Sequence, residues 1–259
     1  MKTNQAKRRV ADGRVVFGSF VFSAETAHVE ILGLTGYDFA ILDLEHAALS
    51  LREVERLVLA ADAAGVTSIV RVPTQVPDLI GRVLDTGAQG LMLPHVKGRG
   101  EVLRISRAVR YPPDGIRGAC TGVRAAGYTA IPFDLHVKQT AEEVWVLGLI
   151  EDAEAGAAIE EIVTSGLDVV IPGPADLSAS LGVPGQFQHP SVTDMADRVM
   201  KAASGSGRAV AGMYVANPAH AEQWIRKGAR VIVYGIDTRV MCDAYRRGIE
   251  QMRAFVPGP

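Results

Sequence analysis

The most constraining feature of this sequence is an alternation of short apolar runs with longer amphipathic stretches, repeated along almost the whole chain. The short runs are rich in β-branched residues and bounded by Gly, Pro or Asp, which is typical of buried β-strands. The stretches between them carry apolar residues at helical spacing, as Val54, Leu57 and Val58 do. Eight strands are predicted: Val15–Phe22, Phe39–Asp43, Ser68–Val72, Gly90–Leu93, Val144–Ile150, Asp168–Ile171, Val210–Val215 and Arg230–Tyr234.

Eight strands that alternate with helices, most of them apolar on both faces, predict a parallel sheet covered by helices. Their number favours closure into a (β/α)₈ TIM barrel. An open doubly wound sheet is the competing fold, but no Gly-rich dinucleotide fingerprint follows the first strand. With 259 residues and no linker or low-complexity tract, we expect a single barrel domain over residues 1–259.

One segment interrupts the alternation, from Tyr111 to about Glu143. It is far longer than a usual connection between a helix and a strand. A connection of this length is typically functional or lies at an interface, and we expect one of these roles here.

Composition excludes several classes of protein. The net charge is −2, and no cluster of Lys and Arg provides a basic surface, so we expect no nucleic-acid partner. No apolar run reaches membrane-spanning length and the N-terminus has no apolar signal segment, which predicts a soluble cytoplasmic protein without a membrane partner. Cys120 and Cys242 have no metal-site spacing and indicate incidental thiols of a reducing compartment.

Ionisable residues gather where the predicted strands end. In a parallel barrel the carboxyl ends of the strands form one rim, and that rim holds the active site. Any one such residue could be a helix cap or part of a surface ion pair. Several at the same rim predict an active site, and they are Asp43, Glu45, His46, Arg71, His95, Glu151 and Asp176.

Two of these residues, Glu151 and Asp176, follow neighbouring predicted strands. Two carboxylates can share one hard divalent cation and leave its other positions to water and substrate oxygens, as Mg²⁺ or Mn²⁺ prefers. Gly173 allows close approach of a ligand to the backbone, Pro174 restrains the turn, and the amide of Ala175 can donate to a carboxylate. The alternative is a plain turn with Asp176 as helix cap.

Arg71 ends a predicted strand, where an unpaired guanidinium is costly and an anion is needed. That anion is either a structural aspartate or a substrate carboxylate or enolate. His46 close to Asp43 offers an oriented imidazole for proton transfer near neutral pH. The alternative for His46 is a purely structural contact with the following loop.

Lysine positions restrict the chemistry. A Schiff-base aldolase needs a lysine on a barrel strand. None of the lysines falls within a predicted strand: they are Lys2, Lys7, Lys97, Lys138, Lys201 and Lys227. If a carbanion forms, a metal ion rather than an imine must accept its charge.

Seven motifs, in order, resemble the HpcH/HpaI family of class II, metal-dependent pyruvate aldolases, of which 4-hydroxy-2-oxoheptanedioate aldolase is an example. They are "DFAILDLEHA", "IVRVP", "LDTGAQGLMLPHV", "RYPPDGIRG", "GLIED", "IPGPADLSASLG" and "VIVYGIDT". The resemblance runs from about Gly18 to the last helix. It implies a TIM barrel that reversibly cleaves 4-hydroxy-2-oxo acids to pyruvate and an aldehyde through a pyruvate enolate.

The resemblance also implies a role for each matching residue. Glu151 and Asp176 match the ligands of a divalent metal, Mg²⁺ or Mn²⁺, with Co²⁺ as a further candidate. Arg71 matches the arginine that binds pyruvate and its enolate, and His46 with Asp43 matches the acid–base dyad. Gly173, Pro174 and Ala175 match the turn that binds the pyruvate carboxylate. Family members form hexamers, or trimers of dimers, by exchanging C-terminal helices, and we expect a homo-oligomer here.

Two positions depart from the family pattern. Leu149 stands where the family commonly has Gln, and Tyr214 stands where a smaller aliphatic residue often borders the aldehyde pocket. Both therefore enter the predicted substrate-binding set and leave the natural acceptor open. A citrate-synthase-like enzyme of the same superfamily, which joins oxaloacetate to an acyl-CoA in siderophore biosynthesis, is the alternative. A barrel that binds a ligand without catalysis is a further one.

Overall fold

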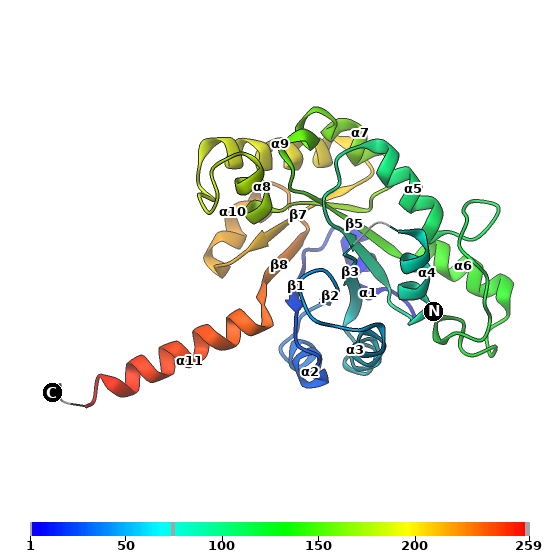
Figure 1. The fold of residues 1–259 in the computed structure, drawn as a ribbon, viewed down its shortest axis with the longest axis horizontal. Helices are drawn as coiled ribbons and strands as arrows, with labels where there is room; N and C mark the ends of the chain where they lie inside the picture. Colours follow the sequence, from blue (N-terminus) through cyan, green and yellow to red (C-terminus); the bar gives the residue numbers. More distant parts are fainter. Residues whose placement is uncertain (1, 74–75, 257–259) are drawn as a thin grey trace.

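The computed structural model describes residues 2–73 and 76–256, and its centre is a closed barrel of eight parallel strands in chain order. Each strand pairs with the next, and β8 closes the barrel on β1 (Figure 1). The TIM barrel prediction is confirmed. The strands are β1 Val16–Val21, β2 Phe39–Asp43, β3 Thr67–Arg71, β4 Gly90–Leu93, β5 Trp145–Ile150, β6 Val169–Pro172, β7 Val210–Val215 and β8 Val231–Ile236.

All eight strands were predicted, and only their ends differ. β1 is one residue shorter at each end than the prediction, and β8 continues to Ile236 instead of ending at Tyr234. β3 and β6 are each displaced by about one residue at their ends. Strand ends are defined by pairing with neighbours, which apolar runs alone do not reveal.

Helices lie around the barrel, most of them on its outside (Figure 1). They are α1 Gln5–Ala11, α2 Thr26–Leu34, α3 Leu51–Ala64, α4 Pro77–Asp85, α5 Arg99–Val109, α6 Phe133–Glu143, α7 Ile159–Thr164, α8 Pro174–Ser180, α9 Pro190–Ser206, α10 Ala221–Arg226 and α11 Asp237–Arg253. Short 3₁₀ helices lie at η1 Arg124–Ala126, η2 Ala153–Ala157 and η3 Pro218–His220. No helix among the described residues is long and apolar enough to span a membrane.

The sequence explains why the helices begin and end where they do. Ser50 caps α3 by accepting from the amide of Glu53, and the Glu53 carboxylate accepts in return from the amide of Ser50, which completes a capping box. Gly65 then ends α3 in the left-handed conformation that a glycine adopts without strain.

Alternate residues along each strand divide the core into two parts. One part lies inside the barrel and includes Phe39, Ile69 and Trp145, while the other lies between the strands and the helices. Helix α1 contributes Ala6 and Val10 to the inner part, so this helix packs against one end of the barrel. The sequence predictions did not include this helix.

The long segment after α5 is only partly a loop. Its last third forms α6, and the remainder, residues 111–132, contains η1. A buried cluster holds this segment to the body: the Tyr111 hydroxyl lies 3.1 Å from Nε2 of His136, and Arg117 stacks over the Tyr111 ring at 4.7 Å. The predicted role at an interface stays a prediction.

Helix α11 differs from the other helices because it extends away from the barrel (Figure 1). None of its residues is buried, although Met241, Tyr245 and Ile249 are large and apolar or aromatic. Its first residue holds it to the barrel, since the Asp237 carboxylate accepts from the amides of Phe22 and Ser23.

Candidate active site

A cavity of about 680 Å³ opens at the carboxyl ends of the strands and holds most of the predicted site. The predicted residues that line it are His46, Arg71, Leu149, Glu151, Gly173, Pro174, Ala175, Asp176 and Tyr214. Asp43 lies beneath them, fully buried and bonded to Arg71. The structure therefore brings together all the residues that the sequence assigned to the site, because parallel strands end at one rim.

The cavity has two sides, which we name by their strands. The β2–β6 side consists of His46, Arg71, Leu149, Glu151 and 173–176, and the β7–β8 side consists of Tyr214, His220, Gln223, Trp224, Lys227 and Arg239.

Arg71 is held by two carboxylates and an aromatic ring. Register places it directly beside Asp43 on the neighbouring strand, and its Nε donates to Asp43 Oδ1 at 3.1 Å. Its Nη2 also contacts Asp43 Oδ2, and its Nη1 lies 3.2 Å from Glu45 Oε2. The guanidinium carbon lies 4.6 Å from the centre of the Phe20 ring. Arg71 is therefore paired with a structural aspartate, which was one of its two predicted partners. It also lines the cavity, where it can meet a substrate anion.

His46 and Asp43 meet through the backbone rather than through the imidazole. Asp43 Oδ1 accepts from the amides of Glu45, at 2.8 Å, and His46, at 3.3 Å. The imidazole Nε2 instead lies 3.7 Å from Glu45 Oε2, and the ring remains more than half exposed toward the cavity. Asp43 therefore fixes the loop that carries His46, and Glu45 is the carboxylate nearest to its ring.

Glu45 is a site residue to which the sequence argument gave no role. Besides Arg71 and His46, its carboxylate lies 4.0 Å from Nε2 of His95. Burial raises the pKa of Glu45, and the positive charge of Arg71 opposes that rise. The sequence did indicate that Glu45 lies at the rim, because it stands between Asp43 and His46 just after a strand.

Glu151 is a buried carboxylate, only 3% exposed, with one strong contact. Its Oε1 accepts from the backbone amide of His95 at 2.8 Å. Burial raises the pKa of Glu151 to about 7, and the negative charges of Asp176 and Glu45 add to that rise. A positive charge placed between Glu151 and Asp176 would remove this electrostatic cost.

The turn after β6 is shaped around Glu151. Ile150 pairs with Pro172 across β5 and β6, and this register brings Gly173 beside Glu151. A Cβ added to Gly173 would overlap Oε2 of Glu151 and lie 2.8 Å from its Cβ. Only glycine leaves room for the carboxylate in this place. Gly173, and not Asp176, occupies the N-cap position of α8, so the alternative of Asp176 as N-cap does not hold.

The two carboxylates fit a hard divalent cation. Both donors are oxygens, Glu151 is buried against the negative charge of Asp176, and the cavity beside them leaves room for water and substrate oxygens. Across residues 2–73 and 76–256, no group of three or more His, Cys, Asp or Glu side chains is arranged to hold a metal. Two carboxylates are therefore all that the described chain supplies.

Comparison with known proteins decides the family. The model of the HpcH/HpaI aldolase/citrate lyase family matches residues 16–244. The chain belongs to this family. The resemblance noted in the sequence is thereby confirmed.

Three proteins illustrate the relationship. A relative from Paraburkholderia phytofirmans, named hydroxypyruvate/pyruvate aldolase, is 34% identical over 97% of this chain and 98% of its own length. The crystal structure of an HpcH/HpaI aldolase/citrate lyase family protein from Burkholderia cenocepacia has a TM-score of 0.91 and 32% identity, covering 97% of this chain and all of that one. The structure of citrate synthase SbnG has a TM-score of 0.86 and 30% identity, covering 96% of this chain and 97% of its own.

The two residues that depart from the family pattern both line the cavity. Leu149 is 5% exposed and belongs to the apolar core inside the barrel, so it gives the cavity an apolar floor beside Glu151. Tyr214 lies on the opposite side, with its ring 6.3 Å from that of Phe20. Burial raises the pKa of the Tyr214 hydroxyl, and the positive charge of Arg239 opposes that rise.

The remaining residues of the β7–β8 side were not predicted from the sequence. Gln223, Trp224 and Lys227 belong to or follow α10, and Arg239 lies in the first turn of α11. Gln223, Trp224 and Lys227 come from or follow a helix well after the end of β7, so the strand-end argument did not reach them. Arg239 follows β8 as closely as His46 follows β2, and the strand-end rule could have found it.

Proposed function

We propose that this member of the HpcH/HpaI family is a metal-dependent aldolase that reversibly cleaves 4-hydroxy-2-oxo acids to pyruvate and an aldehyde. One observation carries the proposal: a buried carboxylate beside an exposed one, a carboxylate-held arginine and an exposed histidine line the same cavity. The curated relative that bears the name hydroxypyruvate/pyruvate aldolase supports it over nearly the full chain.

Glu151 and Asp176 would hold the divalent metal, with Mg²⁺ or Mn²⁺ preferred and Co²⁺ as a further candidate. When bound, the metal supplies a Lewis acid for the keto group of the 2-oxo acid. None of the described barrel strands carries a lysine that could supply an imine. The ammonium of the rim lysine Lys97 lies 3.4 Å from Asp152 and also contacts Glu154, and the ammonium of Lys227, which lines the β7–β8 side, lies 2.6 Å from Asp197.

Arg71 binds the oxygens of the 2-oxo acid and stabilises the negative charge that develops there in the enolate. Asp43 and Glu45 hold its guanidinium in place before substrate arrives, so little reorganisation is needed during the reaction. The amides of the Gly173–Ala175 turn bind the substrate carboxylate.

His46 moves the proton. In the cleavage direction its imidazole accepts the proton of the C4 hydroxyl, the C3–C4 bond breaks, and the electron pair of that bond forms the enolate. The aldehyde leaves, and protonation at C3 gives pyruvate. Glu45, at 3.7 Å, orients the imidazole and stabilises its protonated form.

A citrate-forming condensation remains a second candidate because of one observation. The chain is 30% identical to the solved citrate synthase SbnG, over 96% of this chain. Under this alternative the protein would consume oxaloacetate and an acyl-CoA thioester instead of exchanging pyruvate with aldehydes.

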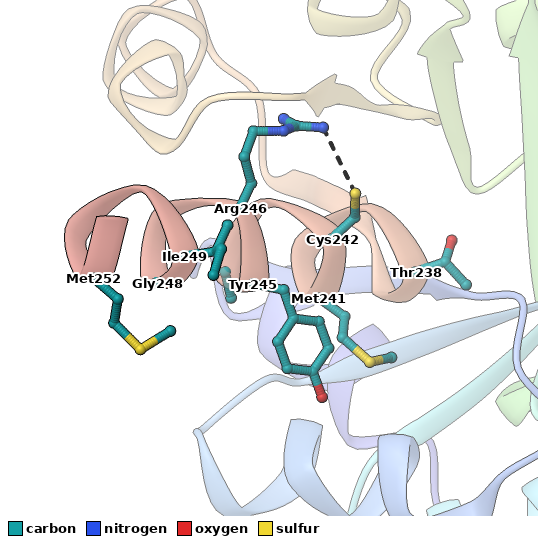
Figure 2. A pocket seen from close by; sticks show the side chains of 9 residues that line it. Thr238, Met241, Cys242, Tyr245, Arg246, Gly248, Ile249 and Met252 are labelled. Atoms are coloured by element: carbon teal, nitrogen blue, oxygen red, sulfur yellow. Dashed lines mark hydrogen bonds between the residues drawn. The ribbon is translucent and has the colours of Figure 1, made fainter. Parts of the chain in front are cut away.

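Helix α11 supports the proposal that the protein is a homo-oligomer, either a hexamer or a trimer of dimers. Figure 2 shows Met241, Tyr245 and Met252 on one side of this helix, where they border an open groove. These side chains are 37%, 72% and 60% exposed in the single chain. Packing of α11 against a second copy would bury them. A cytoplasmic location stays a prediction of the sequence.

The test is a metal-dependent aldol assay with the purified protein. We expect pyruvate and an aldehyde to form a 4-hydroxy-2-oxo acid with Mg²⁺ or Mn²⁺, and we expect EDTA to abolish the reaction. Consumption of acetyl-CoA with oxaloacetate, without any aldol product, would replace the aldolase assignment by the condensing one.

A further inference from the structure

His95, which follows β4 at the rim, has a backbone conformation that few residues adopt. Its φ is +52°, in the left-handed region that residues other than glycine rarely occupy. Among the non-glycine residues that the structure describes, only Tyr128 and Thr129 share a positive φ. Such a conformation is costly and persists only where surrounding contacts hold it, so it points to a function for His95.

The backbone amide of His95 fixes one oxygen of Glu151. It donates to Oε1 at 2.8 Å, and the carboxylate is only 3% exposed. The other oxygen, Oε2, lies on the side of Gly173, where an added Cβ would overlap it. The orientation of the Glu151 carboxylate is therefore determined from two sides, by a donor at Oε1 and by a close approach of backbone at Oε2.

The positive φ explains how His95 can make this contact. The next amide, that of Val96, donates to the carbonyl oxygen of Leu149 at 3.1 Å. Two consecutive amides thus donate to β5 and the residue after it, one to a backbone carbonyl and the other to a side chain. The dihedral angles of His95 set the angle between these two amides. A negative φ would change that angle, so both hydrogen bonds could not keep their present geometry.

The side chain of His95 holds this backbone in place. Its Nδ1 lies 3.0 Å from Oδ2 of Asp152, the residue that follows Glu151. The imidazole is about half exposed and does not line the cavity. His95 is therefore bonded to two consecutive residues, through its amide to Glu151 and through its ring to Asp152, and its ring is not placed to contact a substrate in the cavity.

We propose that His95 is a positioning residue for metal binding. Its left-handed backbone aims the amide at Glu151, and its contact with Asp152 holds that backbone. The imidazole takes no part in the chemistry. This inference rests on the proposed function, in which Glu151 and Asp176 hold the divalent metal, and it names the residue that orients the buried ligand.

Two substitutions of His95 separate the backbone from the imidazole. Asparagine adopts the left-handed conformation more readily than most residues, and its side-chain amide can donate to Asp152. Valine is β-branched, so it is strained at a positive φ, and it has no polar atom for Asp152. A positioning role through the backbone predicts that His95→Asn retains metal binding and that His95→Val loses it.

The experiment is titration calorimetry of the purified protein with Mn²⁺ alone. We expect His95→Val to raise the dissociation constant about 10- to 100-fold, which is the usual effect of changing a residue that orients a metal ligand. His95→Asn should bind Mn²⁺ as tightly as the wild type. Wild-type affinity in His95→Val would overturn the inference. Equal losses in both variants would also overturn it, because the imidazole itself would then be required.

Tyr128→Val is the matched control for a strained backbone. Tyr128 has a φ of +53°, nearly that of His95, but its side chain is exposed and it lies in the segment of residues 111–132. Valine there should lower thermal stability without changing the affinity for Mn²⁺. Arg226→Gln is the surface control, since Arg226 pairs with Glu222 on α10 and does not line the cavity.

Asp152→Ala provides a second test if His95→Val folds poorly. It leaves the His95 amide in the chain and removes the contact that holds the ring. We expect Mn²⁺ affinity to fall by a smaller factor than in His95→Val. Unchanged affinity would contradict the role given to this contact.

Kinetics at saturating metal distinguish positioning from direct catalysis. If His95 acts through the metal ligand, high Mn²⁺ should restore the kcat of His95→Val toward that of the wild type. A kcat that stays low with wild-type Mn²⁺ affinity would overturn the inference by giving His95 a direct role.

Deuterium exchange of the pyruvate methyl group separates this inference from the proposed function. Glu151→Gln should abolish Mn²⁺ binding, which identifies the site. A wild type that binds Mn²⁺ at Glu151 without exchanging pyruvate would overturn the proposed function and leave the role of His95 intact. Absence of Mn²⁺ binding by the wild type would overturn both.

Discussion

The two sides of the cavity are built differently. On the β2–β6 side, charged groups are buried and fix one another: Arg71 is held by Asp43 and Glu45, and Glu151 is held by the amide of His95. On the β7–β8 side, Lys227 and Arg239 are about half exposed and pair with partners on the helices outside the barrel. A buried network holds a fixed geometry for a chemical step, whereas exposed side chains can change without disturbing the barrel. We therefore expect substitutions on the first side to abolish the reaction and those on the second to alter selectivity.

The strongest test of this contrast is Arg71→Ala. It removes the charge that stabilises the enolate and leaves Asp43 buried without its cation. We expect kcat for aldol cleavage to fall by about 10²- to 10³-fold or more, because this is the usual cost of removing one fixed hydrogen-bond donor to the negative charge of the transition state. Arg71→Lys, which retains a charge, should fold more stably but remain strongly impaired. Thermal denaturation of both variants separates folding from catalysis, and wild-type turnover by Arg71→Ala would refute the role of Arg71.

Gly173→Ala tests whether the carboxylate pair depends on its glycine neighbour. The new methyl group would overlap Glu151 Oε2 and displace the carboxylate. We expect Mn²⁺ affinity, measured by titration calorimetry, to fall about 10- to 100-fold, which is the usual effect of changing a residue that orients a metal ligand. Gly205→Ala in α9 is the control, because no atom lies within 4 Å of its added Cβ. Equal affinity in both variants would show that Gly173 does not shape the site.

The buried Glu151 also makes stability depend on pH. Since its pKa is raised to about 7 in the folded protein, the folded state binds an extra proton between its usual pKa of 4.5 and 7. Stability without metal should therefore be lower above pH 7 and rise as the pH falls toward 4.5. Relative to Glu151→Gln, the wild type should be less stable at pH 8 by roughly 3 kcal/mol in the absence of metal. This difference should shrink at pH 5 in denaturant titrations, and identical pH profiles would contradict the burial argument.

Glu45→Gln should have a smaller effect, because it alters a neighbour of the imidazole rather than a group that binds substrate. We expect kcat to fall by about tenfold, since a negative charge that orients the imidazole is lost. Steady-state kinetics of aldol cleavage measures this change, and a kcat equal to that of the wild type would contradict the role of Glu45.

Much of this structure could be predicted from the sequence because short stretches of residues determine each strand. Each strand is an apolar run bounded by turn residues, and parallel strands bring their ends to one rim, so Arg71 and Glu151 were placed correctly without coordinates. The contact between His46 and Glu45 was not predictable, because residues two to three positions apart in a loop can meet in several ways. Likewise Gln223 and Trp224 come to the cavity on α10, and no strand end marks them.

The most direct measurement is proton NMR of pyruvate incubated with the purified protein in D₂O, with and without Mg²⁺ or Mn²⁺. Enolate formation at the β2–β6 side predicts a metal-dependent loss of the methyl signal, unaffected by Arg226→Gln and lost in Arg71→Ala. An undiminished methyl signal with every metal would contradict the assignment of this cavity to pyruvate aldol chemistry.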